Sequence, residues 1–258
     1  MINYPSSKLP DVGTSIFAVM SALANEHGAI NLSQGFPDFN CPDELIALVT
    51  RYMQEGHNQY APMPGMSALR HKISEKTENV YGYRPDADRE VTVTSGATEA
   101  LFAAITAVVK PGDEVVVLEP CYDSYAPAIR LAGGIPIYVP LAIPDFSIDW
   151  DLLKKNISRR TRLIIINTPH NPTGAVIPRE DLEKLANLTD GTDILILSDE
   201  VYEHMVFDGK EHVSALQVES LRLRAFVISS FGKTYHTTGW KIGYVVAPPA
   251  LTAELRKM

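Results

Sequence analysis

Short apolar runs alternate with amphipathic helical patterns through most of this chain, and this alternation limits its fold more than any other feature. The runs are rich in Val, Ile and Leu and predict strands at residues 90–94, 114–119, 135–139, 162–167, 193–198, 225–230 and 242–246. Helix-forming residues recur at amphipathic spacing between them, over residues 97–109, 124–131, 149–155 and 178–188. Strands that are apolar on both faces and separated by helices indicate a mostly parallel sheet covered on both sides. The predicted class is therefore α/β, a three-layer sandwich around a seven-stranded sheet.

Three further helices are predicted ahead of the sheet, at residues 14–26, 42–55 and 66–81. Gly28, Gly56 and Gly82 follow them as C-terminal stops. We interpret residues 1–45 as an N-terminal segment and residues 46–258 as one large domain. After Pro248-Pro249 a helical pattern has just begun when the sequence stops, so we interpret this ending as a cut.

Charge and cysteine content limit the function classes. The 23 Lys and Arg against 31 Asp and Glu give a net charge of −8, which argues against nucleic-acid binding as the main role. The two cysteines are too few for a disulfide framework or a closed zinc site, which favours a reducing compartment. Neither a signal peptide nor an apolar run of about 18 residues is present, so we expect a cytoplasmic protein without membrane contact.

Polar residues follow two of the predicted strands. Residues 92–100, Thr-Val-Thr-Ser-Gly-Ala-Thr-Glu-Ala, form a strand, a small-residue turn and a helix start, an arrangement that can bind phosphate. Taken alone, this segment favours simple helix capping by Ser95 or Thr98. Asn171, in Asn-Pro-Thr-Gly, lies at the carboxyl end of a strand, where open α/β sheets place ligands, although the same residues make a good turn.

A carboxylate and a phenol come after the next strand. Asp199 and Glu200 follow Ile-Leu-Ile-Leu-Ser, and Tyr202 lies three residues beyond Asp199. A buried carboxylate needs either a cationic partner or a capping role, and the sequence leaves both open for Asp199.

A lysine follows the strand at residues 225–230. Burial and the neighbouring cation Lys241 would lower the pKa of Lys233 and favour Schiff-base chemistry, although a lone lysine is more often on the surface. The Gly-Lys-Thr around it is not a P-loop, because Val227 stands where that motif requires glycine. The sequence also lacks Gly-x-Gly-x-x-Gly, Gly-x-Ser-x-Gly and His-Glu-x-x-His, which disfavours Rossmann dehydrogenases, α/β-hydrolases and zinc proteases.

Four motifs in order carry a family resemblance. Ser-Gly-Ala-Thr-Glu-Ala, Asn-Pro-Thr-Gly, Ser-Asp-Glu-Val-Tyr and Ser-Phe-Gly-Lys-Thr-Tyr-His-Thr-Thr-Gly-Trp-Lys-Ile-Gly-Tyr resemble those of fold-type I, class I aminotransferases, which use pyridoxal 5′-phosphate (PLP). The resemblance extends from Leu-Ser-Gln-Gly-Phe-Pro-Asp-Phe at residues 32–39 to the last helix and is nearest the methionine or aromatic and kynurenine branch. It implies the large PLP-binding domain of a homodimeric enzyme that moves an amino group from an L-amino acid to a 2-oxo acid.

The same resemblance implies residue roles. Lys233 would bind PLP covalently and act as a base, and Asp199 would keep the ring nitrogen protonated. Asn171 and Tyr202 would contact the phenolic oxygen, and Tyr122 would stack on the ring. The remaining implied contacts are Gly96, Ala97, Thr98, Ser230 and Lys241 at the phosphate, Tyr60 at the phosphate of the other subunit, and Gly35 with Asn171 at the substrate.

One family feature has no counterpart in this sequence. Family members continue into a small C-terminal domain with an arginine that grips the substrate α-carboxylate, and no arginine here takes that role. Two alternatives to a transaminase stay open. One is a PLP-dependent carbon–sulfur β-lyase, since the same carbanion can eliminate, and the other is a fragment that binds PLP or dimerises without efficient turnover.

Overall fold

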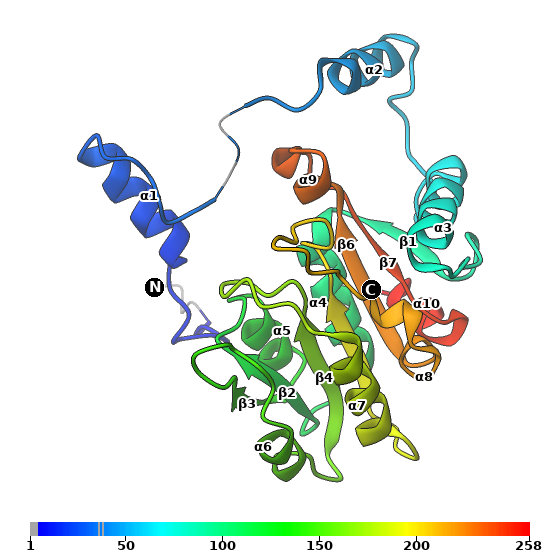
Figure 1. Ribbon diagram of the computed structural model, residues 1–258. Coiled ribbons are helices and arrows are strands. Elements are labelled where there is room, and N and C mark those ends of the chain that lie inside the picture. Colours follow the sequence, from blue (N-terminus) through cyan, green and yellow to red (C-terminus); the bar gives the residue numbers. More distant parts are fainter. Residues whose placement is uncertain (1–4, 36, 38) are drawn as a thin grey trace.

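The computed structural model describes residues 5–35, 37 and 39–258, and a seven-stranded sheet lies at its centre (Figure 1). The strands are β1 Val91–Thr94, β2 Glu114–Glu119, β3 Ile135–Pro140, β4 Thr161–Asn167, β5 Leu195–Asp199, β6 Ala225–Ser230 and β7 Gly243–Val246. Their order is β1-β7-β6-β5-β4-β2-β3, and only β7 runs antiparallel to its neighbours β1 and β6. The prediction of a mostly parallel, seven-stranded α/β sheet is confirmed.

The central strands of the sheet are buried on both faces, which explains their long apolar runs. Along β4, Ile164 and Ile166 join one cluster of buried side chains, while Leu163 and Ile165 join the other. This alternation places successive side chains on opposite faces. The helices on one face are α4 Gly96–Val108, α5 Tyr125–Leu131 and α10 Pro249–Leu255, and those on the other are α3 Ser67–Tyr81, α6 Trp150–Lys155, α7 Arg179–Thr189 and α8 Glu219–Arg222.

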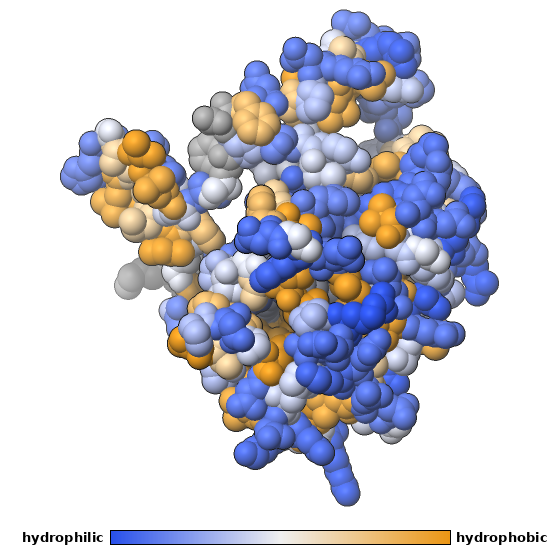
Figure 2. All heavy atoms as spheres, viewed as in Figure 1, coloured by the Kyte–Doolittle hydropathy of each residue, from blue (hydrophilic) through white to orange (hydrophobic). Residues whose placement is uncertain are grey.

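Two helices stand away from these layers, α1 Ile16–Glu26 and α2 Asp43–Gln54, and neither has a buried residue (Figure 1). Apolar side chains of α1 are exposed, among them Ile16, Met20 and Leu23, and they colour this helix orange in Figure 2. The proposed division at residue 45 stays a prediction, and α2 begins just before it.

Three short elements complete the chain: η1 Ala215–Gln217, α9 Phe231–Thr234 and η2 Thr238–Trp240. Sequence patterns did not predict them, because one turn of helix is too short to show a periodicity. Among the residues given above as described, the structure has no helix with the length and apolarity that a membrane crossing needs.

Candidate active site

Segments distant in the sequence line one cavity of about 750 Å³ at the carboxyl edge of the sheet. Parallel pairing brings the ends of β4, β5 and β6 to this edge, at Asn167, Asp199 and Ser230. The predicted site residues that line it are Gly35, Gly96, Ala97, Thr98, Tyr122, Asn171, Asp199, Tyr202, Ser230, Lys233 and Lys241. Tyr60 is the exception, since it is outside this lining and its side chain is wholly exposed. Its role toward a second subunit stays a prediction.

Asp199 provides a buried carboxylate on the cavity wall. Burial raises its pKa to about 6, against hydrogen bonds from the Tyr125 hydroxyl and the Val201 backbone N–H. The Tyr125 hydroxyl donates to Oδ2 at 2.6 Å, and the Val201 N–H donates to Oδ1 at 3.3 Å. No ion pair to Asp199 occurs within the described part of the chain. Neither of the two roles expected from sequence is met by the described residues, because no cation pairs with Asp199 and the Val201 N–H belongs to a turn, not to a helix start.

Lys233 lies on α9, directly after β6, where its side chain is half-buried and lines the cavity. Burial lowers the pKa of its ammonium group, and the nearby charge of Lys241 lowers it further. The Lys233 Nζ lies 5.4 Å from the centroid of the Tyr202 ring. Burial and the Lys241 charge both favour the neutral amine of Lys233, which is the nucleophilic form.

The N-terminus of α4 faces the same cavity and can receive an anion. The Ser95 side chain makes no capping hydrogen bond there, so the simple helix-cap interpretation loses support. Lys241 lies beside this turn, with its Cδ 3.8 Å from where a Cβ on Gly96 would lie. A Cβ on Gly243 would come within 2.7 Å of the Ala97 nitrogen, so only glycine allows β7 to approach α4 this closely.

Polar and aromatic side chains surround the space between Asp199 and Lys233. The Asn171 Nδ2 lies 3.5 Å from the Tyr202 hydroxyl, and both residues line the cavity. The Tyr122 ring meets the Tyr125 ring edge to face, with centroids 5.8 Å apart. These contacts surround a volume large enough for a ring-sized ligand.

Sequence reasoning missed two residues that organise this wall. Tyr125 contacts Asp199 across 74 positions of sequence, a distance that no local motif reveals. Asn167 donates from Nδ2 to the Asp199 carbonyl at 2.8 Å and accepts the Asn171 N–H at 2.7 Å. Its position as a polar residue ending an apolar strand was the available signal.

The arrangement has three chemical capacities. It can bind an anionic group at α4 and Lys241, pair a cation with Asp199, and present an amine to a carbonyl at Lys233. In the parts of the chain that the structure describes, no group of three His, Cys, Asp or Glu residues is placed to hold a metal ion.

Known proteins are similar in sequence to this chain. It matches the family described as "Aminotransferase class I and II" over residues 27–258. It is 55% identical over 254 residues to a methionine aminotransferase of Escherichia coli, covering 98% of this chain and 66% of that protein. A probable N-succinyldiaminopimelate aminotransferase of Mycobacterium tuberculosis is 42% identical, covering 97% of this chain and 64% of the relative.

Solved structures agree with these matches. An E. coli structure described as identifying a methionine aminotransferase function has a TM-score of 0.95 and 54% identity, covering 99% of this chain and 67% of that one. The M. tuberculosis N-succinyldiaminopimelate aminotransferase structure also has a TM-score of 0.95, at 41% identity, with coverages of 98% and 67%. This chain thus spans about two thirds of the length of these relatives. With a family match over most of its residues and a relative more than half identical, the chain belongs to the class I and II aminotransferases.

Proposed function

We propose that this chain binds PLP through Lys233 and transfers the amino group of an L-amino acid, methionine or an aromatic one, to a 2-oxo acid. Class I and II aminotransferases use PLP as their cofactor. The observation that carries the proposal is that Lys233, Asp199 and the N-terminus of α4 line the same cavity. Each of these matches a different chemical group of PLP.

The phosphate of PLP fits the turn at the start of α4. Backbone N–H groups of Gly96, Ala97 and Thr98 would bind it, because the helix N-terminus favours an anion. Lys241 adds a positive charge and Ser230 a hydroxyl on the same wall. The absence of a side chain at Gly243 lets β7 lie directly against the start of α4.

The ring fits between Tyr122 and the end of β5. Asp199 would keep the ring nitrogen of PLP protonated. The resulting ring cation would be the ionic partner that Asp199 lacks among the described residues. Tyr202 and Asn171 would hydrogen-bond the phenolic oxygen, since their polar atoms lie side by side in the cavity. Tyr122 would stack on the ring face.

Bound PLP supplies an aldehyde for amines and a ring that withdraws electrons from the substrate Cα. Lys233 would hold the cofactor through Nζ, and its lowered pKa increases the neutral, nucleophilic share of the amine. The same Nζ then acts as the general base that takes the proton from the substrate Cα. Gly35 would lie beside the substrate carboxylate.

An uncharged, largely apolar donor suits the cavity. Phe17, Leu101 and Met205 are part of its lining, and the described lining residues include no arginine to pair with a dicarboxylic side chain. The 55% identity to the E. coli methionine aminotransferase supports methionine in particular.

We also propose that the functional form is a homodimer. The apolar faces of α1 and α2 are uncovered, and the wholly exposed Tyr60 has no contact with the cavity of its own chain. A second copy would cover these faces and place Tyr60 at the partner's phosphate. Two-fold symmetric dimers are also the commonest oligomers.

The test is a half-reaction on the PLP-loaded protein. L-Methionine should abolish the visible absorbance of the lysine-bound cofactor and release its 2-oxo acid with the sulfur retained, whereas L-aspartate should react far more slowly. Lys233→Ala is the control and should give no turnover. Release of a thiol, pyruvate and ammonia from a cysteine conjugate, without 2-oxo acid from methionine, would favour the β-lyase instead. PLP binding without any product would favour the inactive fragment.

A further inference from the structure

The turn after β5 presents alternate side chains to opposite sides. Tyr202 lines the cofactor cavity, whereas Glu203, the next residue, is directed away from it and is buried. The Glu203 side chain retains only 3% of its exposure. The mechanism proposed above uses Asp199 and Tyr202 but gives no task to this buried carboxylate.

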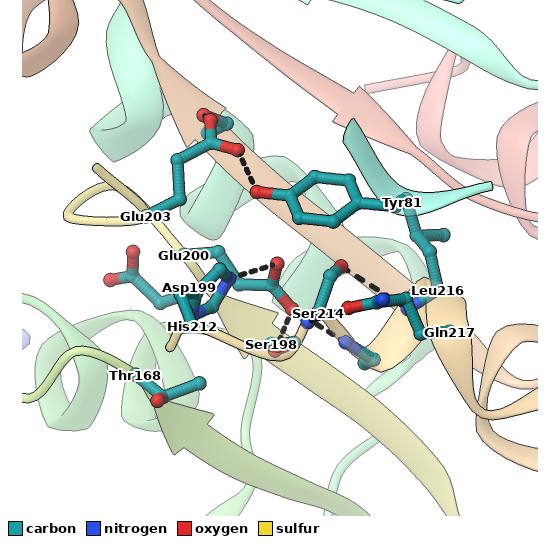
Figure 3. Close-up of polar contacts among 12 residues, drawn as sticks. Tyr81, Thr168, Ser198, Asp199, Glu200, Glu203, His212, Ser214, Leu216 and Gln217 are labelled. Atoms are coloured by element: carbon teal, nitrogen blue, oxygen red, sulfur yellow. Dashed lines mark hydrogen bonds and ion pairs between the residues drawn. The ribbon is translucent and has the colours of Figure 1, made fainter. Parts of the chain in front are cut away.

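Donors from three separate elements converge on the Glu203 carboxylate. From α3, the Lys76 ammonium and the Tyr81 hydroxyl both donate to Oε2. From β6, the Ser229 hydroxyl donates to Oε1, and from β7 the Tyr244 hydroxyl lies 3.4 Å from the same oxygen. Figure 3 shows the Tyr81 and Glu203 side chains pointing toward one another.

These contacts keep Glu203 charged. Burial opposes its ionisation, but the Lys76 charge and the hydrogen bonds from Lys76, Ser229 and Tyr81 together lower its pKa. The Lys76 side chain is itself 28% exposed, and its Nζ lies 4.9 Å from the Tyr81 ring centroid. Removing one partner of such a pair would leave an uncompensated buried charge, so the ionised carboxylate is held beside these donors.

A second carboxylate fixes the beginning of the same turn. Glu200 is buried, accepts hydrogen bonds from the Ser198 hydroxyl at 2.7 Å and the Ala215 N–H at 2.9 Å, and lies 3.0 Å from His212 Nε2 (Figure 3). The Glu203 N–H also bonds to the Glu200 carbonyl at 3.0 Å. The backbone that carries Tyr202 is therefore held on both sides of this residue, at Glu200 by contacts near η1 and at Glu203 by contacts with α3.

We propose that Glu203, paired with Lys76, is a positioning residue that keeps Tyr202 directed at the phenolic oxygen of the cofactor. The inference rests on the proposed function, because it needs PLP in the cavity. One peptide bond joins Glu203 to Tyr202, so displacement of the carboxylate moves the phenol. The alternative is a purely structural role, in which the cluster only stabilises the packing of α3.

The variants are Glu203→Leu, which removes the acceptor, Glu203→Gln, which keeps neutral acceptor capacity, and Lys76→Met. Tyr202→Phe sets the reference for loss of the phenol. The matched control is Glu78→Gln, which breaks an exposed pair with Arg84 on the same helix. Each protein is measured for PLP affinity, for the pH midpoint of the visible absorbance of the PLP-loaded form, and for thermal unfolding without PLP.

When the phenolic oxygen of the cofactor loses the hydrogen bond from Tyr202, it attracts the proton on the nitrogen that joins Lys233 to the cofactor more strongly. The pH midpoint of the visible absorbance should therefore rise. We expect Tyr202→Phe and Glu203→Leu each to raise it by about one pH unit, the equivalent of one hydrogen bond. Affinity for PLP should fall roughly fivefold to tenfold. Glu203→Leu should add no further shift in the Tyr202→Phe background, Glu203→Gln should shift it less, and Glu78→Gln should leave both readouts unchanged.

A purely structural role would lower the unfolding temperature of Glu203→Leu while leaving the midpoint at its wild-type value, and this result would overturn the inference. Additive shifts in the Tyr202→Phe, Glu203→Leu double variant would overturn it as well. If the wild-type chain bound no PLP at all, the proposed function would fail first. A normal wild-type protein with a shift in Tyr202→Phe alone would reject only the role of Glu203.

Discussion

Replacing Asp199 by asparagine should stabilise the cofactor-free protein above pH 6 while weakening its binding of PLP. Asp199 is only 3% exposed, and burial raises its pKa from 3.8 to about 6. The carboxyl of the unfolded chain thus ionises about two pH units below that of the folded chain. Between these values the folded state binds more protons, so its stability falls as pH rises from about 4 to about 6.

The size of this effect follows from the shift. Two pKa units at about 1.4 kcal/mol per unit give a penalty of about 3 kcal/mol, fully present above pH 6 and absent below pH 4. Asparagine removes the penalty but turns an amide N–H toward one of the donors, Tyr125 or Val201, which costs about 1 kcal/mol. The net gain is about 2 kcal/mol, or roughly 4–8 °C in melting temperature for a chain of this size.

The assay is chemical and thermal unfolding of the cofactor-free protein and Asp199→Asn from pH 4 to pH 8. The wild type should lose stability through this window, and the variant should be flatter and more stable at pH 8. With PLP present the order should reverse, because a ring cation paired with Asp199 contributes more than a neutral amide. We expect roughly a hundredfold loss of affinity, or about 2.7 kcal/mol, which exceeds the gain of about 2 kcal/mol. A variant that is less stable than the wild type at pH 8 without PLP would refute the reasoning.

Three further outcomes are expected. Gly243→Ala should lower the free energy of unfolding by about 1–3 kcal/mol and impair PLP binding, since its Cβ would lie 2.7 Å from the backbone of α4. In the same unfolding and binding titrations, Gly239→Ala should change neither quantity, because its Cβ would meet nothing within 4 Å. Tyr125→Phe should destabilise the cofactor-free protein by about 1.5–3 kcal/mol at pH 7 and by less at pH 4, where Asp199 is protonated, and equal losses at both pH values would contradict this. Tyr60→Phe should change the free energy of unfolding by less than about 0.5 kcal/mol but weaken PLP binding by the dimer, as sedimentation and titration together would reveal.

Local patterns predicted the elements well, because burial on both faces gives the central strands β4 and β5 long apolar runs. The strand predicted at residues 193–198, for example, is β5 Leu195–Asp199. Its one-residue extension matters, since Asp199 pairs in register with Asn167 and is thus held by the sheet. The reversed direction of β7 could not be predicted, because residues 242–246 carry the same apolar signal as a parallel strand.

From the residues alone, the candidate site was predictable mainly where a motif ends a strand. Asn171, Asp199 and Lys233 all follow apolar runs, and parallel pairing brings such ends to one edge. Tyr125 and the Lys76–Glu203 pair were out of reach, because partners 74 and 127 positions apart meet only through the packing of the whole domain.

The most direct test of this account is chemical reduction of the PLP-loaded protein followed by peptide mapping. Borohydride should fix the cofactor to one lysine as a stable secondary amine, and the modified peptide should be the one that carries Lys233. Lys233→Ala should show no fixed cofactor, although the proposed contacts to the phosphate and the ring would remain. Recovery of the adduct on Lys241 or on any other lysine would contradict the central claim.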